Sequence, residues 1–217
     1  EQFMLHKIYS LNENFIKYFD NYDFHNLYKE LLNFCTVDLS AFYFDIRKDT
    51  LYCDPKDSVK RKSTLKLLNI ILDLLLKWFA PILSFTTEEI YQLISKKNKS
   101  IHLQKFAQLP KSFQNLSLNE KWLELIKIRN FSNISIEEKR ASKEIGSSLE
   151  ADLQIKLNDR YKDTVKNIDF SELCITSNAE ISFNEKVEID VSTSKAKGEK
   201  CPICWKINPN SCVRHST

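Results

Sequence analysis

The stretch that decides the fold is LKLLNIILDLLLKWF, residues 65–79, the most apolar segment of the chain. Its four polar residues follow one another at steps of three and four, so they form one stripe along a helix. They are Lys66, Asn69, Asp73 and Lys77. A bilayer-spanning helix needs about 20 mostly apolar residues without such a stripe. The segment therefore predicts a helix that is buried on most sides of a helical bundle and has one edge in water.

The same helical periodicity extends outward in both directions from this segment. Apolar residues recur every three or four positions through 5–19 and 24–44, with a polar break at 21–23 that indicates a helical hairpin. A further helical pattern runs through 119–144. We therefore predict a mainly α-helical chain, with a helical domain over 1–145.

Beyond the helical part, the pattern changes to the alternation that is typical of strands. The alternating stretches are 151–157, 173–176 and 187–191. Residues 159–166 read as a short helix between them. This predicts a small α/β domain over 146–194, which is too small to fold independently and should dock on the helical part.

The glycine count excludes one class of function. The 217 residues include only Gly146 and Gly198, where average usage of roughly 7% would give about fifteen. Phosphate-binding loops need two or three glycines in a short window, so we expect no nucleotide-binding fold here. The net charge of +3 says little about partners. The start lacks the apolar core of a secretory signal, and we expect a cytoplasmic protein.

The strongest chemical motif is Cys201-x-x-Cys204 followed by Cys212-x-x-His215. Two residues between ligands let one turn direct both side chains at one ion, and two such pairs complete the tetrahedron that Zn²⁺ prefers. Four protein ligands leave no open position, so the site should be structural. The alternative is a flexible cysteine-bearing tail; a redox role is less favoured because no βαβ unit surrounds the motif. We predict a zinc knuckle over 195–217.

Two basic clusters predict contacts with phosphate groups. One surrounds the knuckle, where Trp205 could stack on an unpaired base or instead form the small core of the knuckle. The other lies within 47–66, and its alternative reading is a solvated helix end and loop. The predicted RNA contacts are Arg47, Lys48, Arg61, Lys62, Trp205, Lys206 and Arg214. No catalytic residue is predicted, and we expect Asp38 to make a structural salt bridge or a hydrogen bond with the backbone.

Several stretches resemble the C-terminal region of bacterial isoleucyl-tRNA synthetases. They are NFCTVDLSAFYFDIRKDTLYCD (33–54), WFAPILSFTTEEI (78–90), KEIGSSLEA (143–151) and EKCPICWKI (199–207). The similarity runs through most of the chain in the expected order, and the first stretch is long and specific. Two features depart from the family: the knuckle ends in CxxH where CxxC is usual, and its loop of 205–211 is shorter than is common.

The resemblance implies a bundle of the class I synthetase anticodon-binding type, a C-terminal junction domain and a zinc-binding module. It implies isoleucine tRNA as partner, together with the catalytic part of the same parent chain, in a monomer without membrane attachment. One structural zinc would be bound here, with ATP and magnesium only in the parent catalytic domain. The ATP-site signatures His-Ile-Gly-His and Lys-Met-Ser-Lys-Ser are absent. The fragment should therefore bind tRNA without aminoacylating it.

Two other functions remain open from the residues alone. A DNA glycosylase fragment can end in a similar zinc finger, although such an enzyme needs a catalytic amine or carboxylate at its N-terminus. A helical protein-interaction module could use the knuckle only as a clasp, and it would have no affinity for tRNA.

Overall fold

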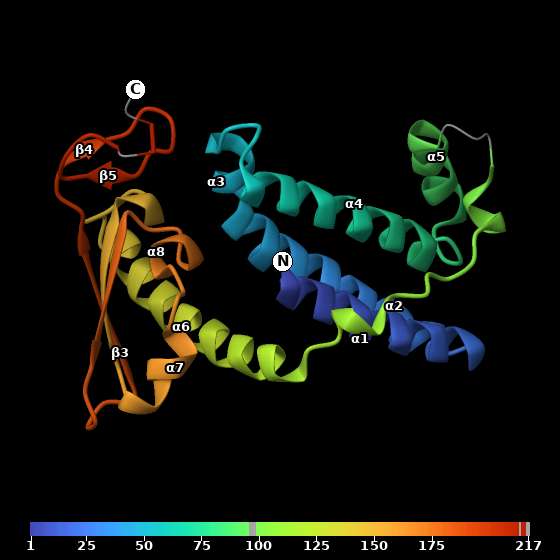
Figure 1. Ribbon diagram of the computed structural model, residues 1–217, viewed down its shortest axis with the longest axis horizontal. Helices are drawn as coiled ribbons and strands as arrows, with labels where there is room; N and C mark the ends of the chain where they lie inside the picture. Colours follow the sequence, from blue (N-terminus) through green and yellow to red (C-terminus); the bar gives the residue numbers. More distant parts are fainter. Residues whose placement is uncertain (96–98, 213, 216–217) are drawn as a thin grey trace. The chain divides into compact units, whose positions relative to one another are not determined.

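The computed structural model describes residues 1–95, 99–212 and 214–215 and divides into two compact units, Glu1–Leu116 and Ser117–Thr217 (Figure 1). The first unit is helical, and the second combines helices with a small sheet and a knuckle. The prediction of a mainly α-helical fold with a small α/β part is confirmed. Within the described residues, no helix combines the length and apolar character needed to cross a membrane.

The first unit is built from helices joined by short connections. They are α1 (Gln2–Asp20), α2 (Phe24–Asn33), the π-helix η1 (Phe34–Phe44), α3 (Asp45–Cys53), α4 (Val59–Phe79), α5 (Ser84–Ile94) and the 3₁₀ turns η2 (Ile101–Leu103) and η3 (Lys111–Phe113). The single helix expected over 24–44 is therefore two helices of different type that follow one another without a break. Lys7 on α1 and Asp38 on η1 form an ion pair at 3.1 Å, which confirms the structural role expected of Asp38.

The core of the first unit centres on Trp78 of α4, whose side chain is fully buried. The ring of Phe15 lies 4.9 Å from it and that of Phe34 lies 6.0 Å from it, both edge-on. The indole N–H donates to Asn12 Oδ1 at 3.0 Å, and Asn12 Nδ2 donates to the carbonyl of Ala107 at 2.8 Å. A buried indole normally needs such a partner. The contacts thus join α1, η1 and α4, and the buried helix predicted over 65–79 is confirmed.

The second unit packs the long helix α6 (Leu116–Ala141) with a three-stranded sheet. The sheet order is β2-β1-β3, with β1 (Ala151–Leu157) parallel to β2 (Asn178–Phe183) and antiparallel to β3 (Ile189–Lys195). Short helical turns connect the strands. These are η4 (Ser148–Glu150), η5 (Asp159–Tyr161), α7 (Lys162–Val165) and α8 (Phe170–Leu173).

Polar contacts, among them those of Arg129 and Ser135, tie α6 to the rest of its unit. Arg129 Nε donates to the carbonyl of Leu173 at 2.9 Å, and the hydroxyls of Ser135 and Thr193 lie 2.8 Å apart. The long helix therefore belongs to the same compact unit as the sheet. The division into two compact units does not test the predicted domain boundaries. The boundaries at 145/146 and 194/195 therefore stay a prediction.

The prediction of a strand at 173–176 is wrong. Asp169 accepts hydrogen bonds from the N–H groups of Ser171 and Glu172 and so caps α8, which ends at the start of that stretch. Phe170 and Leu173 are buried from this helical turn. The second strand is instead β2, because a parallel partner for β1 needs a crossover between them.

His6 on α1 makes a buried contact that depends on its protonation state. Its Nδ1 accepts a hydrogen bond from the backbone N–H of Asn115 at 3.0 Å, and its side chain is buried. Burial, and then the neighbouring charge of Lys7, lowers the pKa of His6. A protonated Nδ1 could no longer accept from Asn115.

We predict that the first unit loses stability in acid through His6. Because the folded pKa lies below the unfolded value of 6.5, the stabilisation is present above pH 6.5 and is lost as the pH falls through the folded pKa. Denaturant unfolding between pH 7.5 and 5 should show a shallower pH dependence in His6→Gln than in wild type. The matched control is His25→Gln at an exposed position. An equally steep dependence in His6→Gln would contradict the assignment.

Candidate metal centre and its basic surroundings

A two-stranded ribbon near the C-terminal end of the described chain carries the predicted metal ligands. Strand β4 (Glu199–Lys200) pairs antiparallel with β5 (Ile207–Asn208). The turn between them is closed by Cys201 N–H to the carbonyl of Lys206 and Trp205 N–H to the carbonyl of Cys201, both at 2.9 Å. This is a knuckle turn, and both cysteines of the CxxC pair are buried in it.

Gly198 allows the two strands to approach. Its φ is +132°, and a Cβ at this position would lie 2.0 Å from the carbonyl oxygen of Asn208. Both the backbone conformation and the close contact require glycine. The other glycine, Gly146, has no such need, since a Cβ there would meet the flexible carboxylate of Glu150 at 3.6 Å.

The structure brings together all four predicted metal ligands. One ligand atom from each of Cys201, Cys204, Cys212 and His215 lies within 4.8 Å of the others. The Cys204 and Cys212 sulfurs are 3.8 Å apart, and His215 Nδ1 lies 3.6 Å from Cys201 Sγ and 3.5 Å from Cys212 Sγ. A tetrahedron with Zn–S bonds of about 2.3 Å has sulfurs separated by about 3.8 Å. The donor set and its spacing therefore fit a tetrahedral metal ion.

The charges of the cysteines also fit a cation. The backbone N–H groups of Cys204 and Ile203 lower the pKa of Cys201 to about 6. Burial, and then the neighbouring sulfurs, raises the pKa of Cys204 to about 12. The thiolate form of Cys201 is thus favoured, whereas the thiolate form of Cys204 beside it is disfavoured. A divalent ion between them would supply the positive charge that several adjacent thiolates require.

Contacts at its base fix the knuckle to the rest of the second unit. Ile207 N–H donates to Ser177 Oγ at 2.6 Å, and Lys200 pairs with Glu150 at 3.6 Å. The ammonium of Lys206 lies 3.4 Å from both the carbonyl and the hydroxyl oxygen of Ser171. Of the predicted RNA contacts, Lys206 therefore has partners inside its own unit.

Trp205 is largely exposed. Its side chain is 60% exposed, and the Lys200 ammonium lies 6.0 Å from the centre of its ring. Its φ of +62° is unusual for a bulky residue. The ring is therefore available on the surface, and the alternative in which Trp205 forms the small core of the knuckle is not supported. Arg214 is also exposed.

In the first unit, the predicted RNA contacts divide into two kinds. Arg47 is only 13% exposed and pairs with Glu1 at 2.9 Å, while Arg61 Nη1 donates to the carbonyl of Asp54 at 2.8 Å. Arg47 therefore joins α3 to the start of α1, and Arg61 joins the first turn of α4 to the residue that follows α3. Lys48 is exposed and lies 3.2 Å from Asp45, and Lys62 is exposed on α4.

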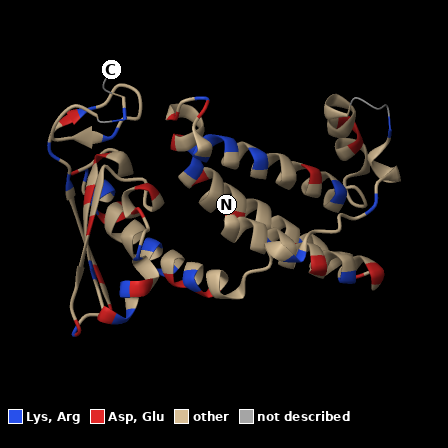
Figure 2. Ribbon diagram, viewed as in Figure 1, with Lys and Arg blue, Asp and Glu red and all other residues tan. Residues whose placement is uncertain are grey.

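The basic residues of α4 lie mainly toward its first turns (Figure 2). Tyr52, near the end of α3, is 83% exposed. It was not among the predicted contacts, although its place inside the basic run of the sequence was a usable signal. An exposed aromatic ring among cations is the combination that single-stranded RNA favours.

We predict that Gly198→Ala destroys the knuckle, whereas Gly146→Ala is tolerated. The alanine Cβ at 198 would clash with backbone atoms and oppose a positive φ, so the pairing of β4 with β5 should fail. Alkylation of Cys201 and Cys204 should then be at least tenfold faster than in wild type. Equal rates in Gly198→Ala and Gly146→Ala would contradict this role.

The chain matches the family described as the anticodon-binding domain of tRNA ligase over residues 1–157. It is 64% identical over 216 residues to the isoleucine--tRNA ligase of Pelagibacter ubique, covering 100% of this chain and 24% of that protein. Isoleucine--tRNA ligases of Bartonella quintana and Agrobacterium fabrum are 37% and 36% identical over 95% of this chain and 22% of their own length.

The chain thus spans about a quarter of the length of the curated relatives it matches. These similarities do not favour the glycosylase fragment or the protein-interaction module. They agree with the resemblance carried by residues 33–54 and 78–90, both of which lie inside the matched region. The chain belongs to the family of anticodon-binding domains of tRNA ligases.

Proposed function

We propose that this chain is the tRNA-binding part of an isoleucine--tRNA ligase and recognises the anticodon region of isoleucine tRNA. The observation that carries the proposal is the family match over residues 1–157, joined to 64% identity along the whole chain with an isoleucine--tRNA ligase. The predicted domain division, 1–145, 146–194 and 195–217, belongs to this proposal.

In this proposal the chain itself binds RNA and catalyses nothing. The parent enzyme joins isoleucine to its tRNA with ATP and magnesium, which bind in the catalytic part of the same polypeptide. The chain contributes affinity and orientation: cations contact the phosphates, and exposed rings and polar edges contact unpaired bases. The parent acts as a monomer.

We assign the contacts with RNA from the exposure of the predicted side chains. Among the predicted residues, Lys48, Lys62, Trp205 and Arg214 are exposed. The remaining three are Arg47, Arg61 and Lys206, which are only partly exposed and make contacts within the chain. We infer that the exposed group contacts RNA directly. The other three residues contribute positive charge and hold the surface in shape.

We also propose that Cys201, Cys204, Cys212 and His215 bind one zinc ion with a structural role. The sulfur-rich donor set selects zinc over harder cations such as magnesium. All four ligands come from the protein, so the ion has no open position for a reacting water. Its role is to hold the turn that carries Trp205.

For RNA binding, we predict that Trp205→Ala weakens affinity for isoleucine tRNA. Stacking of one base on an aromatic ring contributes about 1–3 kcal/mol, so the Kd should rise by roughly 5- to 100-fold. Fluorescence anisotropy with isoleucine tRNA and an unrelated tRNA measures both affinity and selectivity. The control is Phe85→Ala, an exposed aromatic on α5 away from the basic runs. The proposed function fails if wild type shows no preference for isoleucine tRNA.

For the metal, we predict one zinc per chain by elemental analysis. A chelator should disorder the knuckle while most of the helical circular dichroism signal remains, because the helical core is separate. His215→Ala should weaken zinc binding by at least tenfold, whereas His25→Ala should leave it unchanged. Equal zinc affinity in both variants would show that another group supplies the fourth ligand.

A further inference from the structure

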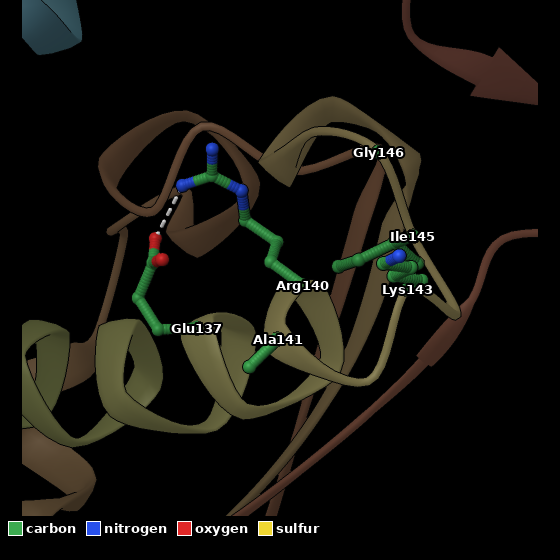
Figure 3. A pocket seen from close by; sticks show the side chains of 6 residues that line it. All are labelled: Glu137, Arg140, Ala141, Lys143, Ile145 and Gly146. Atoms are coloured by element: carbon green, nitrogen blue, oxygen red, sulfur yellow. Dashed lines mark hydrogen bonds and ion pairs between the residues drawn. The ribbon is translucent and has the colours of Figure 1, made fainter.

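A pocket outside the metal centre and the predicted RNA contacts opens where α6 ends. Three of its residues come from the last turns of α6 and three from the segment that follows (Figure 3). They are Glu137, Arg140, Ala141, Lys143, Ile145 and Gly146. The pocket has a volume of about 470 Å³, which is large enough for a phosphate group and its flanking atoms.

The charge of the lining is positive by one unit. It contains Arg140 and Lys143 against Glu137. Arg140 Nη1 contacts the Glu137 carboxylate at 2.6 Å, and these side chains are 46% and 63% exposed. A guanidinium carries five N–H donors, so this pair leaves several for another acceptor. The nearby carboxylate of Glu144 is held by Lys139, with both oxygens at 2.9 Å.

Lys143 stands where the backbone favours glycine. Its φ is +60°. Its N–H donates to the carbonyl of Arg140 at 3.0 Å, and the N–H of Glu144 donates to the carbonyl of Lys139 at 3.1 Å. These bonds close a helix C-terminus of the kind that usually ends in a left-handed glycine. Folding alone disfavours lysine here, as it disfavours the other non-glycine residues with positive φ, such as Tyr22 and Ile175. Replacing Lys143 by glycine should therefore not destabilise the helix end.

The geometry points to a site for one phosphate group of the RNA backbone, bound between Arg140 and Lys143. The inference rests on the proposed function, because it adds a contact to the same RNA. A phosphodiester carries a single negative charge, and the lining carries one net positive charge. The adjoining carboxylate of Glu150 accepts from the Gly146 N–H at 3.0 Å and is paired with Lys200 at 3.6 Å. The exposed rim also suits a chain that passes across the opening, and Arg140 can bind two phosphate oxygens at once.

The test separates the side chain of Lys143 from its backbone. Lys143→Gly removes the charge and at the same time relieves the unfavourable φ. The thermal midpoint of the 217-residue chain should rise by about 2 °C. Its Kd for isoleucine tRNA should rise three- to tenfold, and the slope of log affinity against log salt should become shallower by about 0.7–0.9, the value of one phosphate contact. Arg140→Gln should weaken RNA binding in the same way.

The matched control is Lys186→Gly, at an exposed lysine in the turn between β2 and β3. It removes an equal charge, and its RNA affinity should match wild type. A more stable Lys143→Gly chain with unchanged affinity and salt slope would overturn the inference while leaving the proposed function intact. Wild type that binds no RNA would instead defeat the proposed function itself.

A titration with inorganic phosphate alone distinguishes a free anion from an RNA phosphate. The titration is followed through the NMR signal of the Arg140 side chain. Wild type should show no saturable binding of phosphate at millimolar concentrations. Saturable binding that disappears in Lys143→Gly, together with unchanged RNA affinity, would assign the pocket to a free anion and overturn the proposal.

Discussion

The first unit depends on the burial of the Trp78 indole, a large apolar ring that carries one polar N–H group. Trp78 brings an indole N–H into an apolar core, where an unpaired donor is strongly unfavourable. Asn12 accepts that bond and donates its own to the carbonyl of Ala107, so one amide joins a ring on α4 to a connecting segment far away in sequence. The edge-on rings of Phe15 and Phe34 complete the contact. A separate apolar cluster of Leu76, Ala80 and Ile101 packs against Tyr91 of α5.

The second unit meets a different constraint at its knuckle. Three sulfurs and an imidazole lie within one small sphere, where adjacent negative charges repel each other unless a cation separates them. The fold positions these groups in part through the close approach of two short strands at Gly198. In a chain with two glycines, one is used where the ligand-bearing turn could not otherwise close.

The periodic features of the fold could be predicted from the sequence, and the short ones could not. The helix over residues 65–79 and the ligand spacing of Cys201 and Cys204 each follow from a repeating or fixed interval. The four residues 173–176 alternate by chance inside a turn, because so short a run cannot distinguish a strand from a helix end. The exposure of the basic side chains could not be predicted from the sequence either. Arg47 is recognisably basic in the sequence, but its pairing with Glu1 joins residues that are distant in the chain.

The π-helix η1 has a consequence for the direction of the basic corner that follows it. A π-helix closes its hydrogen bonds one residue later than an α-helix, so each residue turns the chain by roughly 80° where an α-helix turns it by about 100°. Over the eleven residues of η1, the difference amounts to roughly half a revolution. Lys48 and Tyr52 therefore leave on the side opposite to the one an uninterrupted α-helix would give them. The number of residues per turn in the apolar helix η1 thus sets the side on which the exposed residues of α3 lie.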